Sequence, residues 1–305
     1  MEGQGVSEGR AISMRRAYVE LVLCVFFWGA SFASMKIATG EVTPPLAVFM
    51  RIFFGMPILI GAVLTRREFA LPGRREVPAL VFLGALGVVF HQNIQFYGMQ
   101  SAGVANANWM IAGTPSVVAL LGWIFLKERL GAVQIAGLLL SGFGVLLVVG
   151  LGTRGLGMFA LTGTGDLLIA ISAVNWAVFQ ILSRKLVTAR PPTYTAFWIN
   201  AAALAIQTVF VAATRQDVSQ LARITSTAWG AMLFLGCICS GLCYILWYDG
   251  LSVLPAARVT AFQFLQPVLG VILAYFLMGE RFTPFIFAGG ALIILGVWMV
   301  NRRRA

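Results

Sequence analysis

The chain has 305 residues, of which 59% are hydrophobic and 11% are charged, and its mean hydropathy is +0.88. A water-soluble domain carries roughly 25% charged residues, and no soluble fold of this size hides so much apolar surface. The net charge of +11 does not indicate nucleic-acid binding, because the 22 basic residues lie in short gaps between apolar runs rather than on one face.

The apolar runs follow one another along the whole chain, and each is about long enough to cross a hydrocarbon core of about 30 Å as a helix. Turn-forming pairs such as Pro44-Pro45 and Pro191-Pro192 separate them. The sequence therefore predicts an all-α polytopic membrane protein with ten transmembrane helices. We predict these spans at 17–38, 44–65, 78–101, 104–126, 131–151, 166–187, 193–214, 228–251, 256–278 and 284–301.

The two ends of the chain are predicted to be polar tails, residues 1–16 and 302–305. An alternative exists for the start, since Arg15 and Arg16, the following apolar run and Ser31-Phe32-Ala33 resemble a cleavable signal peptide. We favour a first membrane helix, because this segment has a counterpart in the second half that a discarded leader would not need.

Cysteine usage indicates neither a metal site nor a disulfide framework. All four cysteines lie inside apolar runs, and they lack the further His or Cys ligands that a structural zinc site needs. We therefore expect no metal and no cofactor.

The distribution of Lys and Arg predicts the orientation. Most of them lie in the tails and in alternate gaps, among them Arg66, Lys127 and Arg190, whereas intervening loops hold few, such as Arg154 and Arg215. Basic residues favour the cytoplasmic side. Both termini are therefore predicted to be cytoplasmic, in a bacterial inner membrane, and this requires an even number of spans.

The chain resembles itself when it is shifted by about half its length. Each predicted half, 17–151 and 166–301, has five spans, so the halves enter the membrane from opposite sides, and residues 152–165 link them externally. Inverted repeats of this kind are a recurrent basis for alternating access. A shift of 152 residues pairs Gly98 with Gly250, Pro115 with Pro267, Glu128-Arg129 with Glu280-Arg281, Gly137 with Gly289 and Gly144 with Gly296; a slightly different shift pairs Trp28 with Trp176 and Phe49 with Phe197.

These features carry a resemblance to a known family. Ten spans, Trp28-Gly29 in the first and Pro115 in the fourth, followed by Lys127-Glu128-Arg129, resemble the drug/metabolite transporter superfamily. The EamA-type repeat is the most similar, and the resemblance covers nearly all of 17–301. It implies a secondary transporter that exports small metabolites. The whole chain looks most like bacterial amino-acid exporters, including those for aromatic amino acids.

Polar and aromatic side chains within the spans are the candidate binding residues. Polar groups are costly inside a bilayer and usually face a cavity or a partner, and here they gather on spans one, three, four, six, eight and nine. Helix–helix hydrogen bonding, or interfacial packing for the aromatic residues, is the alternative role. The predicted substrate-binding residues are His91, Gln95, Asn108, Trp109, Trp176, Gln180, Tyr244, Tyr248 and Gln263.

Two prolines and two cations within the spans have other candidate roles. Pro115 and Pro267 each remove a backbone donor within a span, which makes either a hinge or a structural kink. Arg51, about 10 Å into the second span, needs either a substrate carboxylate or a structural partner. The same two roles are open for Lys36. Its long aliphatic side chain can also extend so that the ammonium group reaches the membrane surface.

The predicted function is therefore export of a small amphipathic metabolite, such as an amino acid, by alternating access around a central cavity. No carboxylate falls clearly at mid-membrane and His91 is the titratable group there, so we expect facilitated export rather than proton antiport. The expected partners are the lipid bilayer and a small solute, and we take a monomer as the working expectation. The alternatives are an exporter of quaternary-ammonium drugs, a scaffold or receptor, and a membrane-embedded enzyme acting on lipid-linked substrates. That enzyme would need an acid–base cluster which the sequence does not display, so we expect no catalytic residue.

Overall fold

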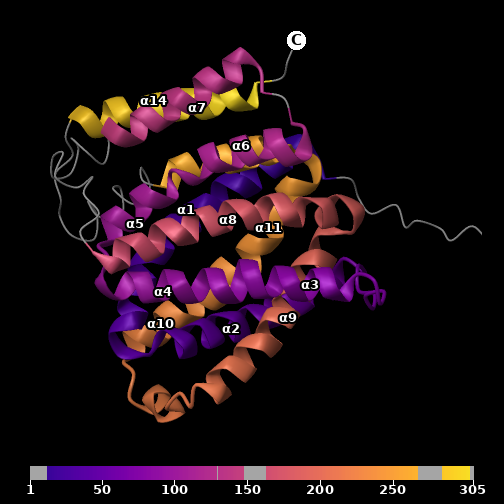
Figure 1. The fold of residues 1–305 in the computed structure, drawn as a ribbon, viewed down its shortest axis with the longest axis vertical. Coiled ribbons are helices and arrows are strands. Elements are labelled where there is room, and N and C mark those ends of the chain that lie inside the picture. The colour runs from indigo at the N-terminus through magenta and orange to yellow at the C-terminus, as the bar shows by residue number, and fades with distance from the viewer. Residues whose placement is uncertain (1–11, 129, 148–162, 267–283, 303–305) are drawn as a thin grey trace, which may run out of the picture.

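The computed structural model describes residues 12–128, 130–147, 163–266 and 284–302, and within these ranges every regular element is a helix (Figure 1). Pro267, Glu280 and most of the predicted linker 152–165 lie outside the described residues.

The first half of the chain forms two long helices followed by shorter helical pieces. The stretch Val77–Ser101 is one continuous helical path whose middle turns are π-helical, and the next predicted span is broken in two at Ala112 and Gly113. The elements are α1 (Met14–Glu41), α2 (Pro44–Thr65), α3 (Val77–Leu83), η1 (Gly84–Phe90), α4 (His91–Ser101), α5 (Val104–Ile111), α6 (Thr114–Leu126) and α7 (Ala132–Leu146).

The second half repeats this order. Ser226–Val253 is again one helical path with a π-helical middle, η5, at the position that the 152-residue shift predicts from η1. The elements are α8 (Thr164–Ala189), α9 (Pro192–Ala213), η4 (Val218–Ala222), α10 (Ser226–Leu233), η5 (Phe234–Leu242), α11 (Cys243–Val253), α12 (Ala256–Ala261), η6 (Phe262–Leu265) and α14 (Pro284–Asn301).

Six helical paths of the described residues are long and apolar enough to cross a membrane. They correspond to the predicted spans one, two, three, six, seven and eight, and the second span, 44–65, is confirmed with the same bounds. The remaining described helices that are apolar, such as Ala132–Leu146, are shorter. The all-α, multi-pass architecture is thus confirmed, whereas the number ten stays a prediction.

Apolar side chains on the outside and polar ones inside are the pattern that lipid as solvent requires. Leu139 is 70% exposed and Val209 68% exposed, and both lie on helices that we place in the membrane. Buried positions instead include many amides and hydroxyls, such as Gln92, Asn200 and Gln207. The polar interior lies where the helices of the two halves meet.

Glycines at equivalent positions of the two halves make equivalent contacts. A methyl group added to Gly84 in η1 would lie 2.8 Å from the carbonyl oxygen of Ile199, and one added to Gly236 in η5 would lie 3.0 Å from that of Arg51. Ile199 and Arg51 occupy equivalent places on α9 and α2. Each π-helical segment therefore packs against the second helix of the opposite half, as expected for halves related by a two-fold axis.

The same reciprocity holds at the ends of the third spans. A methyl group on Gly98 would lie 2.9 Å from the Cδ1 atom of Ile169 on α8, and one on Gly250 would lie 2.8 Å from the Cδ2 atom of Leu21 on α1. Leu21 and Ile169 are again equivalent positions. At Gly98 the backbone oxygen of Gly165, also at 2.9 Å, leaves no room for a side chain, whereas at Gly250 the side chain of Leu21 would have to shift.

Helices α7 and α14 lie side by side at one edge of the molecule (Figure 1). A methyl group on Gly137 would lie 2.7 Å from the carbonyl oxygen of Gly296, and one on Gly144 would lie 2.6 Å from that of Gly289. The earlier glycine of one helix thus meets the later glycine of the other, so these equivalent helices run antiparallel. Antiparallel packing of equivalent helices is the arrangement that inverted halves produce.

Candidate functional site

A small cavity lies between the two halves, and its wall comes from both. Its volume is about 50 Å³, which is room for a few water molecules, so a larger solute enters only when the helices move apart. The lining residues come from α1, α2, α4, α5, α8, α11 and the segment around η6. They are Trp28, Ser31, Phe32, Arg51, His91, Gln92, Gln95, Ile111, Trp176, Tyr244, Gln263 and Gln266.

Helix α4 supplies more polar residues of the wall than any other described helix. His91, Gln92 and Gln95 lie within about 100° of arc on this helix, because successive residues turn by about 100°. The Nδ1 atom of His91 lies 3.1 Å from the carbonyl oxygen of Ser172 on α8, and its ring stacks on Trp176 at 5.0 Å between ring centroids. The imidazole is therefore held against the opposite half.

Aromatic rings form the facing wall. Trp28 and Trp176, equivalent residues of the two halves, meet edge to face with centroids 5.5 Å apart. Tyr244 lies 6.4 Å from Trp28 and 6.1 Å from Trp176. The indole of Trp28 donates to the carbonyl oxygen of Cys239 at 3.0 Å, a group within η5, where π-helical turns alter the backbone bonding pattern.

Five of the nine predicted substrate-binding residues line this cavity: His91, Gln95, Trp176, Tyr244 and Gln263. The structure brings them together from α4, α8, α11 and η6, far apart in the sequence. Their role in binding is a prediction that the geometry allows.

The other predicted binding residues lie elsewhere. The amide of Asn108 donates to the carbonyl oxygen of Val104 on its own helix, and the side chain of Trp109 lies outside the described residues. Gln180 and Tyr248 are fully enclosed beside the cavity rather than in its wall. Pro115 is in the first turn of α6, directly after the break at Ala112 and Gly113 in the fourth predicted span; its role as a hinge or a structural kink stays a prediction.

The two cations differ in their surroundings. Arg51 is 5% exposed and lines the cavity. Lys36 does not line it; its ammonium group donates to the carbonyl oxygens of Met99, Gln100 and Ala102 at 2.9, 3.1 and 3.1 Å. Lys36 therefore caps the C-terminal end of α4, which is a structural pairing.

Sequence reasoning did not select several of the lining residues, namely Trp28, Ser31, Phe32, Gln92, Ile111 and Gln266. Two signals were available. Trp28 is the repeat partner of Trp176, so a cavity on the two-fold axis should include both. Gln92 precedes Gln95 by three residues and shares its helix face. Phe32 and Ile111 carry no such signal, since apolar residues are common in membrane helices.

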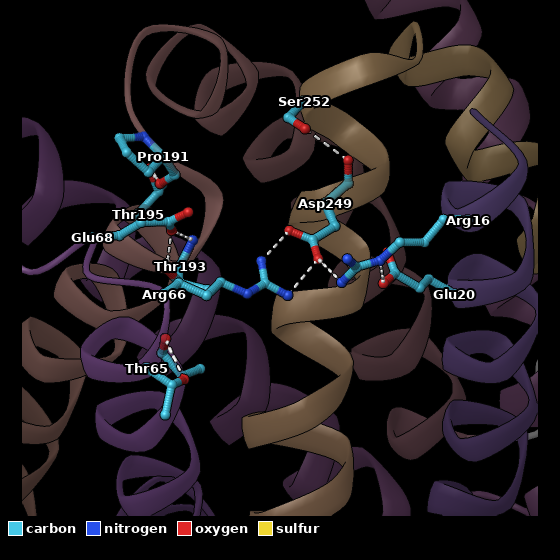
Figure 2. A network of polar contacts seen from close by, with 11 residues as sticks. Arg16, Glu20, Thr65, Arg66, Glu68, Pro191, Thr193, Thr195, Asp249 and Ser252 are labelled. Atoms are coloured by element: carbon cyan, nitrogen blue, oxygen red, sulfur yellow. Dashed lines mark hydrogen bonds and ion pairs between the residues drawn. The ribbon is translucent and has the colours of Figure 1, made fainter. Parts of the chain in front are cut away.

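A network of charged groups lies at the end of the molecule where α1 begins and α2 ends (Figure 2). The carboxylate of Asp249 on α11 is fully buried and accepts two hydrogen bonds of 2.8 Å from the guanidinium group of Arg66. Arg16 lies 3.8 Å from the same carboxylate and donates to Glu20 at 2.7 Å. Asp249 is five residues beyond Tyr244, or about 7.5 Å along the helix from the cavity wall.

Two further polar contacts join the halves. The carboxylate of Glu128, just after α6, lies 3.6 Å from Arg184 on α8 and accepts from the backbone of Ala256 at 3.2 Å. Glu68 accepts from both the hydroxyl and the backbone amide of Thr193, at the start of α9. Like the pair of Arg66 and Asp249, each contact links a first-half residue to a second-half residue.

Comparison with known proteins places these features in a family. The profile of the EamA-like transporter family matches the chain twice, over residues 15–150 and 163–302. A solved crystal structure superposes with a TM-score of 0.76 at 21% sequence identity, covering 95% of this chain and 97% of the other. That likeness supports the fold.

Curated relatives match over nearly their whole length. An uncharacterized transporter of Archaeoglobus fulgidus is 28% identical over 95% of this chain and 98% of its own. The uncharacterized transporter YyaM of Bacillus subtilis is 29% identical, covering 92% of each chain. A protein named a probable terminal-alkyne amino-acid exporter, from Streptantibioticus cattleyicolor, is 26% identical over 96% of this chain and 95% of its own. Because the family profile covers both halves, this protein belongs to the EamA-like transporter family, within the drug/metabolite transporter superfamily.

Proposed function

We propose that this protein is a secondary transporter that exports small amphipathic metabolites, amino acids with aromatic side chains among them. The observation that carries the proposal is the cavity between the halves, whose wall contains residues of both, such as His91 of the first and Tyr244 of the second. A solute bound there contacts both halves at once, so rocking one half against the other changes the side from which it is reached.

The proposed membrane arrangement has ten spans in two inverted five-helix halves, with both termini on the cytoplasmic side. Reciprocal contacts of Gly84 and Gly236, and the antiparallel packing of α7 with α14, support inversion. Two successive matches to the family profile support the division into repeats. The positive-inside pattern supports an orientation that puts Arg66 in the cytoplasm.

Alternating access gives the charged network a role. The pairs Arg66–Asp249 and Glu128–Arg184 join the halves at the end that we assign to the cytoplasm. Under this proposal the pairs keep that end closed. Loading from the cytoplasm then requires them to separate, and their re-formation favours release on the other side.

The cavity wall also favours one kind of cargo over the alternative. Among its described lining residues the permanently charged group is the guanidinium of Arg51, and none of those residues carries a carboxylate. A quaternary-ammonium drug would meet a like charge there, whereas an amino acid brings a carboxylate. One relative is named a probable amino-acid exporter.

Flux through purified protein in proteoliposomes tests the proposal. Vesicles loaded with unlabelled L-phenylalanine should accumulate the labelled amino acid by exchange, and His91→Ala and Gln95→Ala should each reduce this accumulation at least about tenfold. Thr208→Ala is the control, because that hydroxyl bonds to its own helix at an exposed position and should leave flux unchanged.

Two results would count against this assignment. Exchange that is equal in protein-free and protein-containing vesicles, for phenylalanine and for a panel of amphipathic metabolites, would reject the transporter. Uptake that collapses when the pH gradient is dissipated would reject facilitated export and require a proton-coupled carrier.

A further inference from the structure

The guanidinium group of Arg51 has an unusual set of partners for a buried cation. Its Nε atom donates to the hydroxyl of Ser240 at 2.8 Å, one terminal nitrogen lies 3.8 Å from the sulfur of Met35, and the ring of Phe96 lies 5.9 Å away. None of the ion pairs in the described part of the chain includes Arg51. A buried charge is costly unless an opposite charge and hydrogen bonds compensate it.

Acceptors without donors lie in the same cavity. The side-chain amide oxygens of Gln92, Gln263 and Gln266 are buried, and within the described residues no hydrogen-bond donor reaches them. All three residues line the cavity with Arg51. Buried polar groups normally find a partner. The amide nitrogen of Gln92 is also buried without one, so the wall offers a cation and an amide N–H group to an anion, and several neutral oxygens to N–H groups.

The two halves contribute different chemistry to this wall. The place of Arg51 is taken in the second half by Ile199, and the places of His91 and Gln92 are taken by Cys243 and Tyr244. A contact confirms the equivalence, since the sulfur of Cys243 lies 3.8 Å from the carbonyl oxygen of Cys24 as His91 lies against that of Ser172. The first half therefore supplies the cation and the imidazole of the wall, whereas the second half supplies neutral groups, namely Trp176, Tyr244, Gln263 and Gln266.

We infer that Arg51 is the specificity-determining residue of this cavity and that it selects solutes carrying a carboxylate. The planar guanidinium matches a carboxylate in charge and shape. The amide oxygens of Gln92, Gln263 and Gln266 accept from an amino group where the solute has one, and an apolar ring rests on Trp28 and Trp176. The inference rests on the proposed function and refines it, because it makes the carboxylate required and the amino group dispensable.

Three probes that share one ring separate these requirements: 3-phenylpropionate has only the carboxylate, phenethylamine only the ammonium group, and L-phenylalanine both. Binding to the purified full-length protein is measured by isothermal titration calorimetry at pH 7. Both acids should bind at least about tenfold more tightly than phenethylamine, since losing a charge-assisted pair of this kind costs an order of magnitude or more.

Variants at the site separate recognition from structure. Arg51→Met should weaken both acids at least about tenfold and leave phenethylamine unchanged. Arg51→Lys keeps the positive charge but lacks the paired N–H donors of the guanidinium group, so it should retain a reduced preference for acids. This variant is used in place of Arg51→Met if the latter does not fold. Ser240→Ala is the matched control, because it removes the partner of Nε and leaves the cation in place, so acid affinity should stay within about threefold.

The inference is overturned if phenethylamine binds as tightly as the acids, if none of the three probes binds the parent protein, or if Ser240→Ala costs as much affinity as Arg51→Met. Flux is measured separately on the same preparations. Acid-selective binding without exchange of phenylalanine would reject the transporter proposal and leave the role of Arg51 standing, whereas exchange without acid selectivity would reject only the role of Arg51.

Discussion

Two ion pairs between the halves show how burial changes the stability that is lost when one partner is removed. Asp249 is fully buried and bound by both terminal nitrogens of Arg66, whereas the pair of Glu76 and Arg190 has side chains that are 20% and 45% exposed. Both pairs join the two halves. Removing one partner of the buried pair should cost more, because it leaves a buried charge without compensation, whereas water screens the exposed pair.

Removing the buried carboxylate should therefore destabilise the protein. Asp249→Asn keeps the shape but leaves Arg66 and Arg16 without their shared anion, and we expect a loss of about 1–3 kcal/mol in the free energy of unfolding. Thermal unfolding in detergent measures it. If the three groups act as one network, Arg66→Met added to Asp249→Asn should cost much less than the sum of the single changes; full additivity would contradict the network.

The exposed pair gives a pH-dependent contrast. Arg190 donates to Glu76 at 2.6 Å and lowers the pKa of that carboxyl below its ordinary value. A carboxylate with a lowered pKa stabilises the folded state above the ordinary pKa and loses this contribution as the pH falls through the lowered value. Glu76→Gln should cost less than about 1 kcal/mol at neutral pH, and the difference from the parent should shrink below about pH 4.5. A stability difference between the parent and Glu76→Gln that grows as the pH falls would contradict this prediction.

At the scale of helices, hydropathy located the elements well and their internal irregularities poorly. The span 44–65 and α2 coincide because two prolines mark the start and apolar residues fill the interior. The π-helical turns of η1 and η5 left no trace in the apolar pattern, since both are wholly apolar or small in sequence. Each contains a glycine, Gly84 or Gly236, that packs closely against the opposite half, and this contact is not readable from a local apolar pattern.

Glycine at a helix crossing is testable with a matched pair on one helix. A methyl group on Gly144 of α7 would meet the carbonyl oxygen of Gly289 at 2.6 Å, whereas one on Gly142 has nothing within 4 Å. Gly144→Ala should destabilise the protein by about 1–3 kcal/mol through overpacking. Gly142→Ala should be neutral or stabilising by up to about 1 kcal/mol, because alanine favours the helix. Equal melting temperatures of the two variants would contradict the close packing of α7 with α14.

The candidate site was predictable in composition and not in detail. His91, Gln95 and Tyr244 could be selected because polar and amphipathic groups inside a membrane need an enclosed place. Gln180 meets the same criterion and shares the face of Trp176 on α8, yet it is not in the cavity wall, since it lies one turn, about 6 Å, further along the helix. The role of Lys36 could not be predicted from the sequence. Its carbonyl partners belong to the end of α4, 63 to 66 residues away along the chain, and no local sequence pattern indicates that contact.

For the molecule as a whole, the repeat was the most informative signal, because it predicts contacts as well as elements. Equivalent residues that lie near a two-fold axis must meet each other, as Trp28 and Trp176 do at 5.5 Å. Equivalent residues away from the axis must contact equivalent partners, as Gly98 and Gly250 do with Ile169 and Leu21. A parallel repeat would instead bring α7 and α14 together in the same direction.

The inverted arrangement predicts which side of the membrane each connection faces. Arg74 lies between α2 and α3, and Asp217 lies between α9 and α10; both connections follow the second helix of their half, so inverted halves put them on opposite sides. Arg74→Cys and Asp217→Cys, each in a variant whose four native cysteines are replaced by alanine, are labelled with a membrane-impermeant maleimide. In intact spheroplasts Asp217→Cys should react and Arg74→Cys should react only after permeabilisation, as the basic cytoplasmic loops require. Labelling of both positions from one side would show that the halves share one orientation. A site between them could then not open alternately to the two sides of the membrane through rocking of one half against the other.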